Sequence, residues 1–394
     1  MTSQEVALYL HIPYCLAKCP YCDFNSYAAR AWPEEEYAGA LIAELAHRVR
    51  EEPFAGATVT SIFFGGGTPS LFAPRTIARL LREVRDRVAV AGDVEITLEA
   101  NPGTVDEARL AGFREAGVNR LSIGVQSFQP KLLEALGRRH TVDDSVRALR
   151  GARTAGFDNL SLDLIYAVPG EDLDACAFDL AQAISFAPEH VSAYNLTYEK
   201  GTAMHRELEA GRIARASEEL EVALYQLVRE RLADAGYAQY EISNYARAGR
   251  EARHNLAYWR GIPYLGLGAG AHSFAPRTPH DRDPDASWGA RWENLRDPNR
   301  YMEAVRARGT AVGALEERLT RAQAMGEACW LGLRERRGLD PQRFASRFGE
   351  PLEDAFPHVA ELVADGLAEW SDAGRLRLTT RGLLVADSVF ATFL

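Results

Sequence analysis

The chain has 394 residues and a formal net charge of −10, and 47% of its residues are hydrophobic. This length exceeds what one hydrophobic core usually organises, so two domains are expected. The negative charge argues against nucleic acid as the main partner, and no apolar run approaches membrane-spanning length. The first residues lack the basic and apolar regions of a secretory signal, so we expect a cytoplasmic protein whose five cysteines are reduced.

Strands and helices are predicted to alternate along the first half of the chain. Strands are expected at residues 6–10, 60–64, 94–98, 120–126, 159–165 and 190–196, with helical stretches between them. This alternation predicts an α/β fold with a parallel sheet and helical crossovers. Polar and glycine residues follow the strand ends, where a βα barrel carries its active site. A doubly wound sheet, which also binds ligands at its strand ends, is the alternative.

Three cysteines follow the first predicted strand within eight positions, with the spacing C-x3-C-x2-C: Cys15, Cys19 and Cys22. Thiolates are soft ligands that select iron–sulfur clusters, zinc or Cu(I). A zinc site could add His11 or a distant residue, but such sites usually pair two C-x2-C knuckles and no second knuckle is present. An odd number of cysteines without a signal peptide disfavours a disulfide. A cluster with one open iron fits this loop better.

The segment Y-x-H-I-P that begins at Tyr9, followed by this spacing, resembles the cluster loop of the radical S-adenosylmethionine (SAM) superfamily. Tyr21 matches the aromatic position before the last cysteine. The resemblance implies a [4Fe-4S] cluster on the three cysteines, with SAM chelated by the fourth iron and cleaved to a 5′-deoxyadenosyl radical by one electron from the cluster. It also implies a partial (β/α)6 barrel and a reductant such as flavodoxin or ferredoxin.

Residues beyond the later strands match SAM-contacting positions of this superfamily. The run Gly65-Gly66-Gly67-Thr68-Pro69 resembles its glycine motif, in the GGGTP form of the coproporphyrinogen-oxidase-like branch. Carboxylates suit the ammonium and hydroxyl groups of SAM, and arginine suits its carboxylate. Each residue alone is more often a surface or capping residue. The resemblance implies a SAM site made of Tyr9, Tyr21, Gly66, Gly67, Thr68, Glu99, Gln126, Arg138 and Asp163.

The pattern changes from about residue 320 onward. Helices are expected at 323–336, 340–348 and 353–364, with a short strand at 376–379, which together indicate a small, mostly helical, winged-helix-like domain. The third helix is acidic and would repel phosphate, so a lid or packing role is favoured over DNA binding. We expect a barrel domain at 1–250, a connecting segment at 251–319 and a C-terminal domain at 320–394. Within the connector, 265–273 predicts a glycine-rich turn and 276–287 an exposed loop.

Two branches of this family share these motifs: the oxygen-independent coproporphyrinogen III oxidases, which decarboxylate two propionates, and the HemW-type haem chaperones. Phe24 stands where the oxidase pattern has a fourth cysteine. Only fourteen residues precede Cys15, fewer than the substrate-covering extension of the oxidase requires. The segment from His254 to Trp259 fits the HNxxYW motif of the HemW branch.

The haem-binding candidates are His254, Tyr258 and Trp259, with His272 as a weaker one, because histidine ligates haem iron and aromatic rings offer flat faces. Alternatively, His254 is a structural histidine. We expect a chaperone that binds the [4Fe-4S] cluster, SAM and haem and delivers haem to client proteins, which could be membrane-associated. Cleavage of SAM is expected and coproporphyrinogen III dehydrogenase activity is not. The alternatives are that oxidase and, less favoured, a winged-helix redox regulator.

Overall fold

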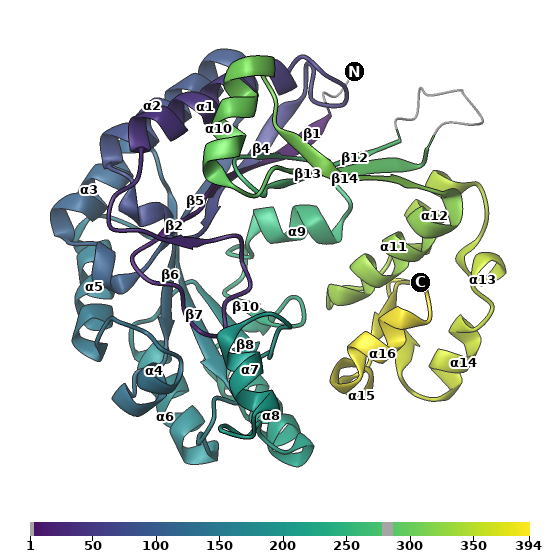
Figure 1. Ribbon diagram of the computed structural model, residues 1–394. Coiled ribbons are helices and arrows are strands. Elements are labelled where there is room, and N and C mark those ends of the chain that lie inside the picture. Colours follow the sequence, from purple (N-terminus) through teal and green to yellow (C-terminus); the bar gives the residue numbers. More distant parts are fainter. Residues whose placement is uncertain (1–3, 278–286) are drawn as a thin grey trace.

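The computed structural model describes residues 4–277 and 287–394 (Figure 1). Its largest sheet has twelve strands in the described part of the chain. In chain order they are β1 (Glu5–Ile12), β4 (Thr58–Gly66), β5 (Ala89–Ala100), β6 (Arg120–Gln126), β7 (Leu160–Tyr166), β8 (His190–Asn195), β9 (Ala238–Gln239), β10 (Asn244–Ala246), β11 (Tyr264–Leu267), β12 (His272–Pro276), β13 (Gly289–Asn294) and β14 (Val312–Leu319).

The six predicted strands pair in parallel in the order β1-β4-β5-β6-β7-β8. Helices cover the outer side of this curved sheet (Figure 1). They are α1 (Glu34–Arg48), α2 (Pro74–Arg87), α3 (Glu107–Ala116), α4 (Pro130–Ala135), α5 (Val142–Thr154), α6 (Leu173–Ser185) and α8 (Glu218–Asp234). The short helix α7 (Ala203–Glu209) packs instead beside the loop that carries the cysteines, where the N–H of Met204 donates to the carbonyl of Pro20 at 2.8 Å. The strand order ends at β14 on one side and β9 on the other without closing. The predicted partial barrel of the α/β class is therefore confirmed.

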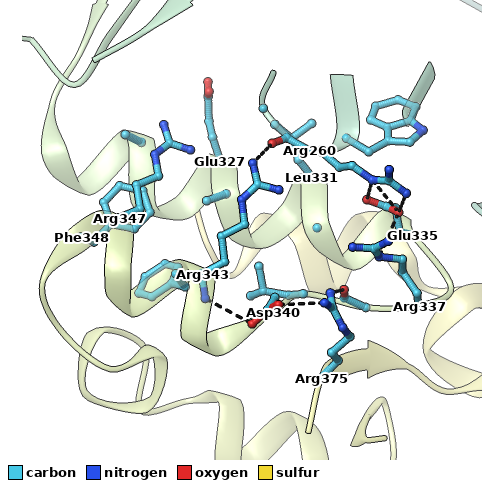
Figure 2. A pocket seen from close by; sticks show the side chains of 18 of the residues that line it. Arg260, Glu327, Leu331, Glu335, Arg337, Asp340, Arg343, Arg347, Phe348 and Arg375 are labelled. Carbon is cyan, nitrogen blue, oxygen red and sulfur yellow. Dashed lines mark hydrogen bonds and ion pairs between the residues drawn. The ribbon is translucent and has the colours of Figure 1, made fainter. Parts of the chain in front are cut away.

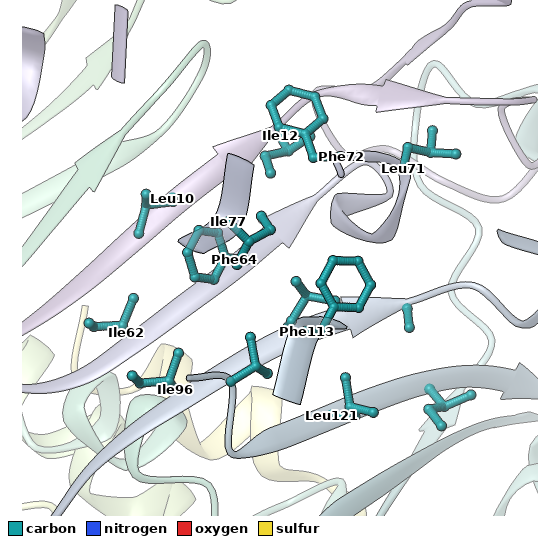
Figure 3. Close-up of a cluster of buried hydrophobic side chains, with 14 of the residues drawn as sticks. Leu10, Ile12, Ile62, Phe64, Leu71, Phe72, Ile77, Ile96, Phe113 and Leu121 are labelled. Atoms are coloured by element: carbon teal, nitrogen blue, oxygen red, sulfur yellow. The ribbon is translucent and has the colours of Figure 1, made fainter. Parts of the chain in front are cut away.

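The main core lies between the outer face of the sheet and the surrounding helices (Figure 3). Alternate residues of each strand point into it, such as Leu10, Phe64 and Leu121, which are at most 1% exposed. Burying side chains of this size stabilises the fold by about 1.5–3 kcal/mol each. Because side chains alternate along a strand, the residues between them point to the concave side. That side is polar, and it carries the candidate site.

Residues 251–319, expected as a connector, extend the sheet. They contain α9 (Arg253–Trp259), the strands β11 to β14 and α10 (Pro298–Arg308). Strand β11 pairs in parallel with β1, from Ala7 opposite Tyr264 onward. The expected glycine-rich turn is thus the link between two strands, β11 and β12. Most of the expected exposed loop, residues 278–286, lies outside the described residues.

Helix α9 packs inside the curve of the sheet, toward the beginning of the parallel strands (Figure 1). The carboxylate of Glu95 on β5 accepts the backbone N–H groups of Arg253 and His254, at 3.1 and 3.2 Å. These are donors of the first helical turn that no residue of the helix itself can satisfy. The ring of His254 lies 5.0 Å from that of Phe63 on β4. The helix therefore fills part of the barrel interior.

The C-terminal domain has its own hydrophobic core and is mostly helical, as predicted. Its elements are α11 (Arg321–Arg334), α12 (Pro341–Phe348), α13 (Leu352–Ala355), α14 (Val359–Ala364), β15 (Ala368–Trp370), β16 (Leu376–Leu378), α15 (Thr380–Leu384) and α16 (Ala386–Ala391). The prediction of one helix over 353–364 is wrong. Pro357 separates α13 from α14, since proline lacks the N–H that a continuous helix needs and restricts the residue before it.

Candidate functional site

The three cysteines lie on a loop that leaves the C-terminal end of β1. Two short parallel strands, β2 (Tyr14–Cys15) and β3 (Tyr27–Ala28), close its base. The side chain of Lys18 crosses the loop and donates to the carbonyl of Phe24 at 2.9 Å. His11 contacts the carbonyl of Asn25 at 2.8 Å through Nε2. The loop is therefore held on both sides while its thiols stay partly exposed.

Each of the three thiols has a polar side chain beside it, and Ser26 lies near both Cys15 and Cys22. These contacts are Thr68 Oγ1 donating to Cys15 Sγ at 3.4 Å, Arg138 Nη1 donating to Cys19 Sγ at 3.6 Å, and Ser26 Oγ lying 4.0 Å from Cys22 Sγ. Burial raises the pKa of the Cys15 and Cys22 thiols. Metal ligation would overcome this, because a coordinating thiol is deprotonated outright.

The chemistry of the three side chains fits an iron–sulfur cluster, because thiolates are the soft ligands that hold one. Such a cluster spreads its thiolates over several irons, and hydrogen bonds to the sulfurs tune it. The hydroxyl and guanidinium groups beside these thiols suit that chemistry. Within residues 4–277 and 287–394, no three side chains of His, Cys, Asp or Glu already stand in the arrangement of a single-ion site.

The glycine motif packs directly against the cluster loop. Gly66 has a φ of +108°, and a Cβ there would lie 2.4 Å from the ring of His11. A Cβ at Gly67 would lie 2.7–2.8 Å from backbone atoms of residues 12–14. The N–H of Gly66 donates to Glu99 Oε2 at 3.2 Å. Glycine is therefore required here by close approach as well as by conformation.

Two carboxylates lie on the concave side: Glu99 next to the end of β5 and Asp163 in the middle of β7. Asp163 accepts hydrogen bonds from Ser122 at 3.0 Å and from Ser161 at 3.3 Å. Burial, with a smaller contribution from Asp163, raises the pKa of Glu99 to about 8. Burial also raises the pKa of Asp163. The buried guanidinium of Arg120 partly opposes this rise in the pKa of both carboxylates. Carboxylates of this kind suit a ligand that brings positive charge and hydroxyl donors.

Gln126 and Arg138 meet where β6 ends. Gln126 has a φ of +66°, a conformation that is uncommon outside glycine and is found where function over-determines the backbone. Arg138 donates to the carbonyl of Gly124 at 2.9 Å and also reaches Cys19. The structure thus brings the end of β6 and the cluster loop together through one guanidinium.

The four haem candidates do not share one environment. His254 is 1% exposed, and its two ring nitrogens lie 3.0 Å from Ser61 Oγ and 3.0 Å from Tyr258 Oη. Burial lowers the pKa of His254 to about 3. Both nitrogens are occupied, so this ring offers none to an iron. Trp259 lies elsewhere, packed under the guanidinium of Arg334 at 4.5 Å.

His272 lies in a cavity of about 340 Å³ beside the cluster loop. Its side chain is 43% exposed, and its Nε2 lies 3.6 Å from Glu293. The rings of Phe24, Tyr258 and Tyr264 line the same cavity, and Phe24 is 64% exposed. Of the two candidate histidines, His272 is the one with an accessible ring.

Sequence reasoning missed the residues that fix this cavity. Asn25 donates to the carbonyls of Ala269 and Arg296, both at 2.9 Å. A Cβ at Gly270 would lie 2.4 Å from the amide nitrogen of Asn25, so the turn between β11 and β12 fits closely against the cluster loop. The only local signal was the glycine-rich run itself, since its partner is more than 240 positions away.

Replacing Glu99 by glutamine is expected to change how stability depends on pH. A carboxyl whose pKa is raised on folding stabilises the protein below its ordinary value near 4.5, and this contribution is lost as the pH rises through about 8. The unfolding free energy of the apoprotein should therefore fall from about pH 5 to about pH 9 by up to a few kcal/mol more in the wild type than in Glu99→Gln. Urea unfolding at several pH values measures this. Glu115→Gln, at an exposed position of α3, is the control, and parallel pH profiles of wild type and Glu99→Gln would contradict the assignment.

Two family models match this chain: the radical SAM superfamily over residues 9–178 and the HemN C-terminal domain over residues 319–385. The heme chaperone HemW of Bacillus subtilis is 35% identical, with 98% of each chain covered. Heme chaperone HemW of Mycobacterium tuberculosis is 37% identical, with 100% of this chain and 96% of the relative covered. The mouse mitochondrial radical S-adenosyl methionine domain-containing protein 1 is 38% identical, with 100% of this chain and 88% of the relative covered.

The solved structure of coproporphyrinogen III oxidase (HemN) from Escherichia coli superposes with a TM-score of 0.82, over 99% of this chain and 90% of that one. Its sequence identity of 24% makes this a likeness of fold. In the described residues, none of the helices has the length and apolar character needed to span a membrane.

Proposed function

The chain belongs to the HemW family of the radical SAM superfamily, and on this basis we propose that it binds haem and delivers it to haem-accepting client proteins. The full-length similarity to proteins named heme chaperone supports this. The observation that carries the proposal is the cavity beside the cluster loop, because it combines an accessible histidine with aromatic walls. Histidine is a common haem ligand, and aromatic faces suit a porphyrin.

We propose that Cys15, Cys19 and Cys22 hold a [4Fe-4S] cluster and that SAM binds at the adjoining strand ends. Glu99 and Asp163 would accept the ammonium and ribose hydroxyl groups of SAM, and Arg138 would attract its carboxylate. Gly66 and Gly67 let the end of β4 pack closely against the cluster loop, which brings this strand end beside the three cysteines. The chemistry that a bound cluster supplies in this superfamily is one electron for cleavage of SAM, which a flavodoxin- or ferredoxin-like reductant would provide.

Within the haem cavity we propose His272 as the axial ligand, in place of His254. The side chain of Tyr258 lines the cavity, and its hydroxyl forms a hydrogen bond with Nε2 of the buried His254. The HNxxYW motif would then act by placing Tyr258, with His254 as a positioning residue. Trp259 of the same motif would hold the C-terminal domain against α9.

Haemin titration of the anaerobically reconstituted protein tests the proposal. We expect a saturable shifted Soret band, and His272→Ala should weaken haem affinity about tenfold or more through loss of the iron ligand. His47→Ala is a matched control, because that side chain is also 43% exposed and also lies beside a glutamate, at 3.3 Å from Glu51. A wild-type protein without a saturable band is not a haem chaperone.

The other function to test is decarboxylation of coproporphyrinogen III. Phe24 stands at the loop position where the oxidase pattern has a cysteine, and its ring is largely exposed. We expect no CO2 release from coproporphyrinogen III in the presence of SAM and a reductant. Release of CO2 from coproporphyrinogen III by a protein that does not bind haem would contradict the chaperone proposal and support the oxidase.

A further inference from the structure

A second pocket, of about 80 Å³, lies between the end of α9 and the C-terminal domain (Figure 2). Its wall combines aromatic and aliphatic side chains, among them Trp259, Phe274 and Phe348, with several arginines. These arginines are Arg260, Arg337, Arg343, Arg347 and Arg375. Such a concentration of guanidinium groups contrasts with the net charge of −10 of the chain.

Three of the five arginines are engaged by acidic residues of the wall. Arg260 pairs with Glu335 at 3.0 Å, and Arg337 lies 3.6 Å from the same carboxylate. Arg375 pairs with Asp340 at 2.8 Å. The carboxylates of Glu335 and Asp340 are therefore already paired with these three arginines.

Arg343 and Arg347 differ from these three, since neither has a carboxylate partner in the described part of the chain. They stand four positions apart on α12 and therefore share one face of the helix (Figure 2). Arg343 donates to the backbone carbonyl of Arg260 at 3.0 Å. The guanidinium of Arg347 lies over the ring of Phe348, 4.9 Å from its centre. The remaining acid of the wall, Glu327, is bound through both oxygens by Arg291 at 3.0 Å.

The guanidinium groups of Arg343 and Arg347 are suited to bind an anion. Burial, together with the neighbouring charge of Arg343, lowers the pKa of Arg347. Arg347 is half-buried and Arg343 is exposed, so it is the partly desolvated charge of Arg347 that gains most from a counter-charge. Guanidinium groups match the geometry of a carboxylate, and such charge-assisted hydrogen bonds are the strong ones.

The size and lining of the pocket restrict the anion. At about 80 Å³ the pocket is well below the roughly 300–1,000 Å³ of pockets that enclose a whole small molecule, so a short carboxylate arm of a larger ligand is what suits it. The aromatic walls suit a flat, apolar body outside it. Phe274 lines this pocket and His272 lines the haem cavity. Both lie on one face of β12, about 7 Å apart along the strand.

Resting on the proposed haem cargo, we propose that Arg343 and Arg347 bind a propionate carboxylate of haem. Haem carries its carboxylates on short arms at one edge of an apolar plane. The C-terminal domain would then hold the cargo through α12 while the barrel contributes the iron ligand. No step of bond formation is involved, only recognition of charge and shape.

The test compares haemin with its dimethyl ester, in which both propionates are blocked. The variant Arg343→Met/Arg347→Met removes the charges and keeps the apolar stems that pack on Phe348. We expect the variant to bind haemin about tenfold more weakly than the wild type. Both proteins should bind the ester with the same reduced affinity. Arg82→Met, at an exposed position of α2, is the control and should behave as the wild type.

The inference is overturned if the variant binds haemin as tightly as the wild type does, or if the wild type does not distinguish the acid from the ester. An equal loss toward acid and ester would show that packing is affected and would also overturn it. If the double variant fails to fold, Arg347→Lys replaces it and should give a smaller loss that is again confined to the acid. Absence of haem binding in the wild type defeats the proposed function itself, and this inference with it.

Discussion

The Cys19→Ser variant should lose the visible absorbance and the bound iron and sulfide of the anaerobically reconstituted protein. Serine offers a hard hydroxyl in place of a soft thiolate, and iron–sulfur clusters are held by thiolates. The other two cysteines of the chain, Cys176 and Cys329, are buried in the hydrophobic cores, so no further thiol stands beside the loop to replace Cys19. We therefore expect the visible absorbance, iron and sulfide of this variant to fall to background, without a partial decrease.

Cys176→Ser is the matched control, because that thiol is 2% exposed in α6 and packs in the core under the sheet. Its cluster content should equal that of the wild type. Iron and sulfide analysis, beside the absorbance spectrum, measures both proteins. A Cys19→Ser protein with wild-type iron and sulfide would remove Cys19 from the ligand set and with it the assignment of the loop.

His254→Ala should destabilise the folded protein by about 2–5 kcal/mol, among the largest effects expected for a side chain outside the cluster. The substitution leaves a cavity beside Phe63 and removes the partner of Ser61 and of Tyr258. Each buried hydroxyl left without a partner costs about 1–3 kcal/mol. Urea unfolding of the apoprotein measures the loss.

His254→Gln is the companion variant, since an amide can replace at least one of the two hydrogen bonds, and its loss of stability should be smaller. Both variants should still bind haem when folded, with Tyr258 less well placed. The opposite result has a clear meaning. A His254→Ala protein as stable as the wild type, but without the Soret band, would make His254 the iron ligand and would displace His272.

The local features of this molecule were readable from the sequence, because short-range patterns determine them. The strands β1, β4 and β5 were predicted from the alternation of strands and helices. Polar and glycine residues after them marked the ends near the cluster loop, Gly66 and Glu99. The break at Pro357 is a local feature that the prediction of one helix over 353–364 missed, although proline ordinarily interrupts a helix. The cysteine spacing and the absence of a second C-x2-C knuckle favoured an iron–sulfur cluster over zinc, and this ligand assignment stays a prediction.

The long-range features were not readable in this way. Pairing of β11 with β1 joins residues about 257 positions apart, Ala7 and Tyr264, and a four-residue strand gives little sign of its partner. The sequence of α9 is compatible with His254 as a haem ligand and with His254 as a buried structural residue, because an imidazole can serve in either role. Only the positions of Ser61 and Tyr258 around its ring separate the two interpretations.

The parallel pairing of β1 with β11 also limits how this protein can be dissected. Strand β1 lies inside the sheet only because β11 covers one of its sides, while β4 covers the other. A fragment that ended at residue 250 would expose a row of unpaired N–H and C=O groups along Ala7 to Leu10, beside the cluster loop. Exposed edge strands of this apolar kind recruit other chains and aggregate. The half with the three cysteines is therefore best studied in the intact chain, and an insoluble truncation would report on this exposed edge and not on whether a cluster is bound.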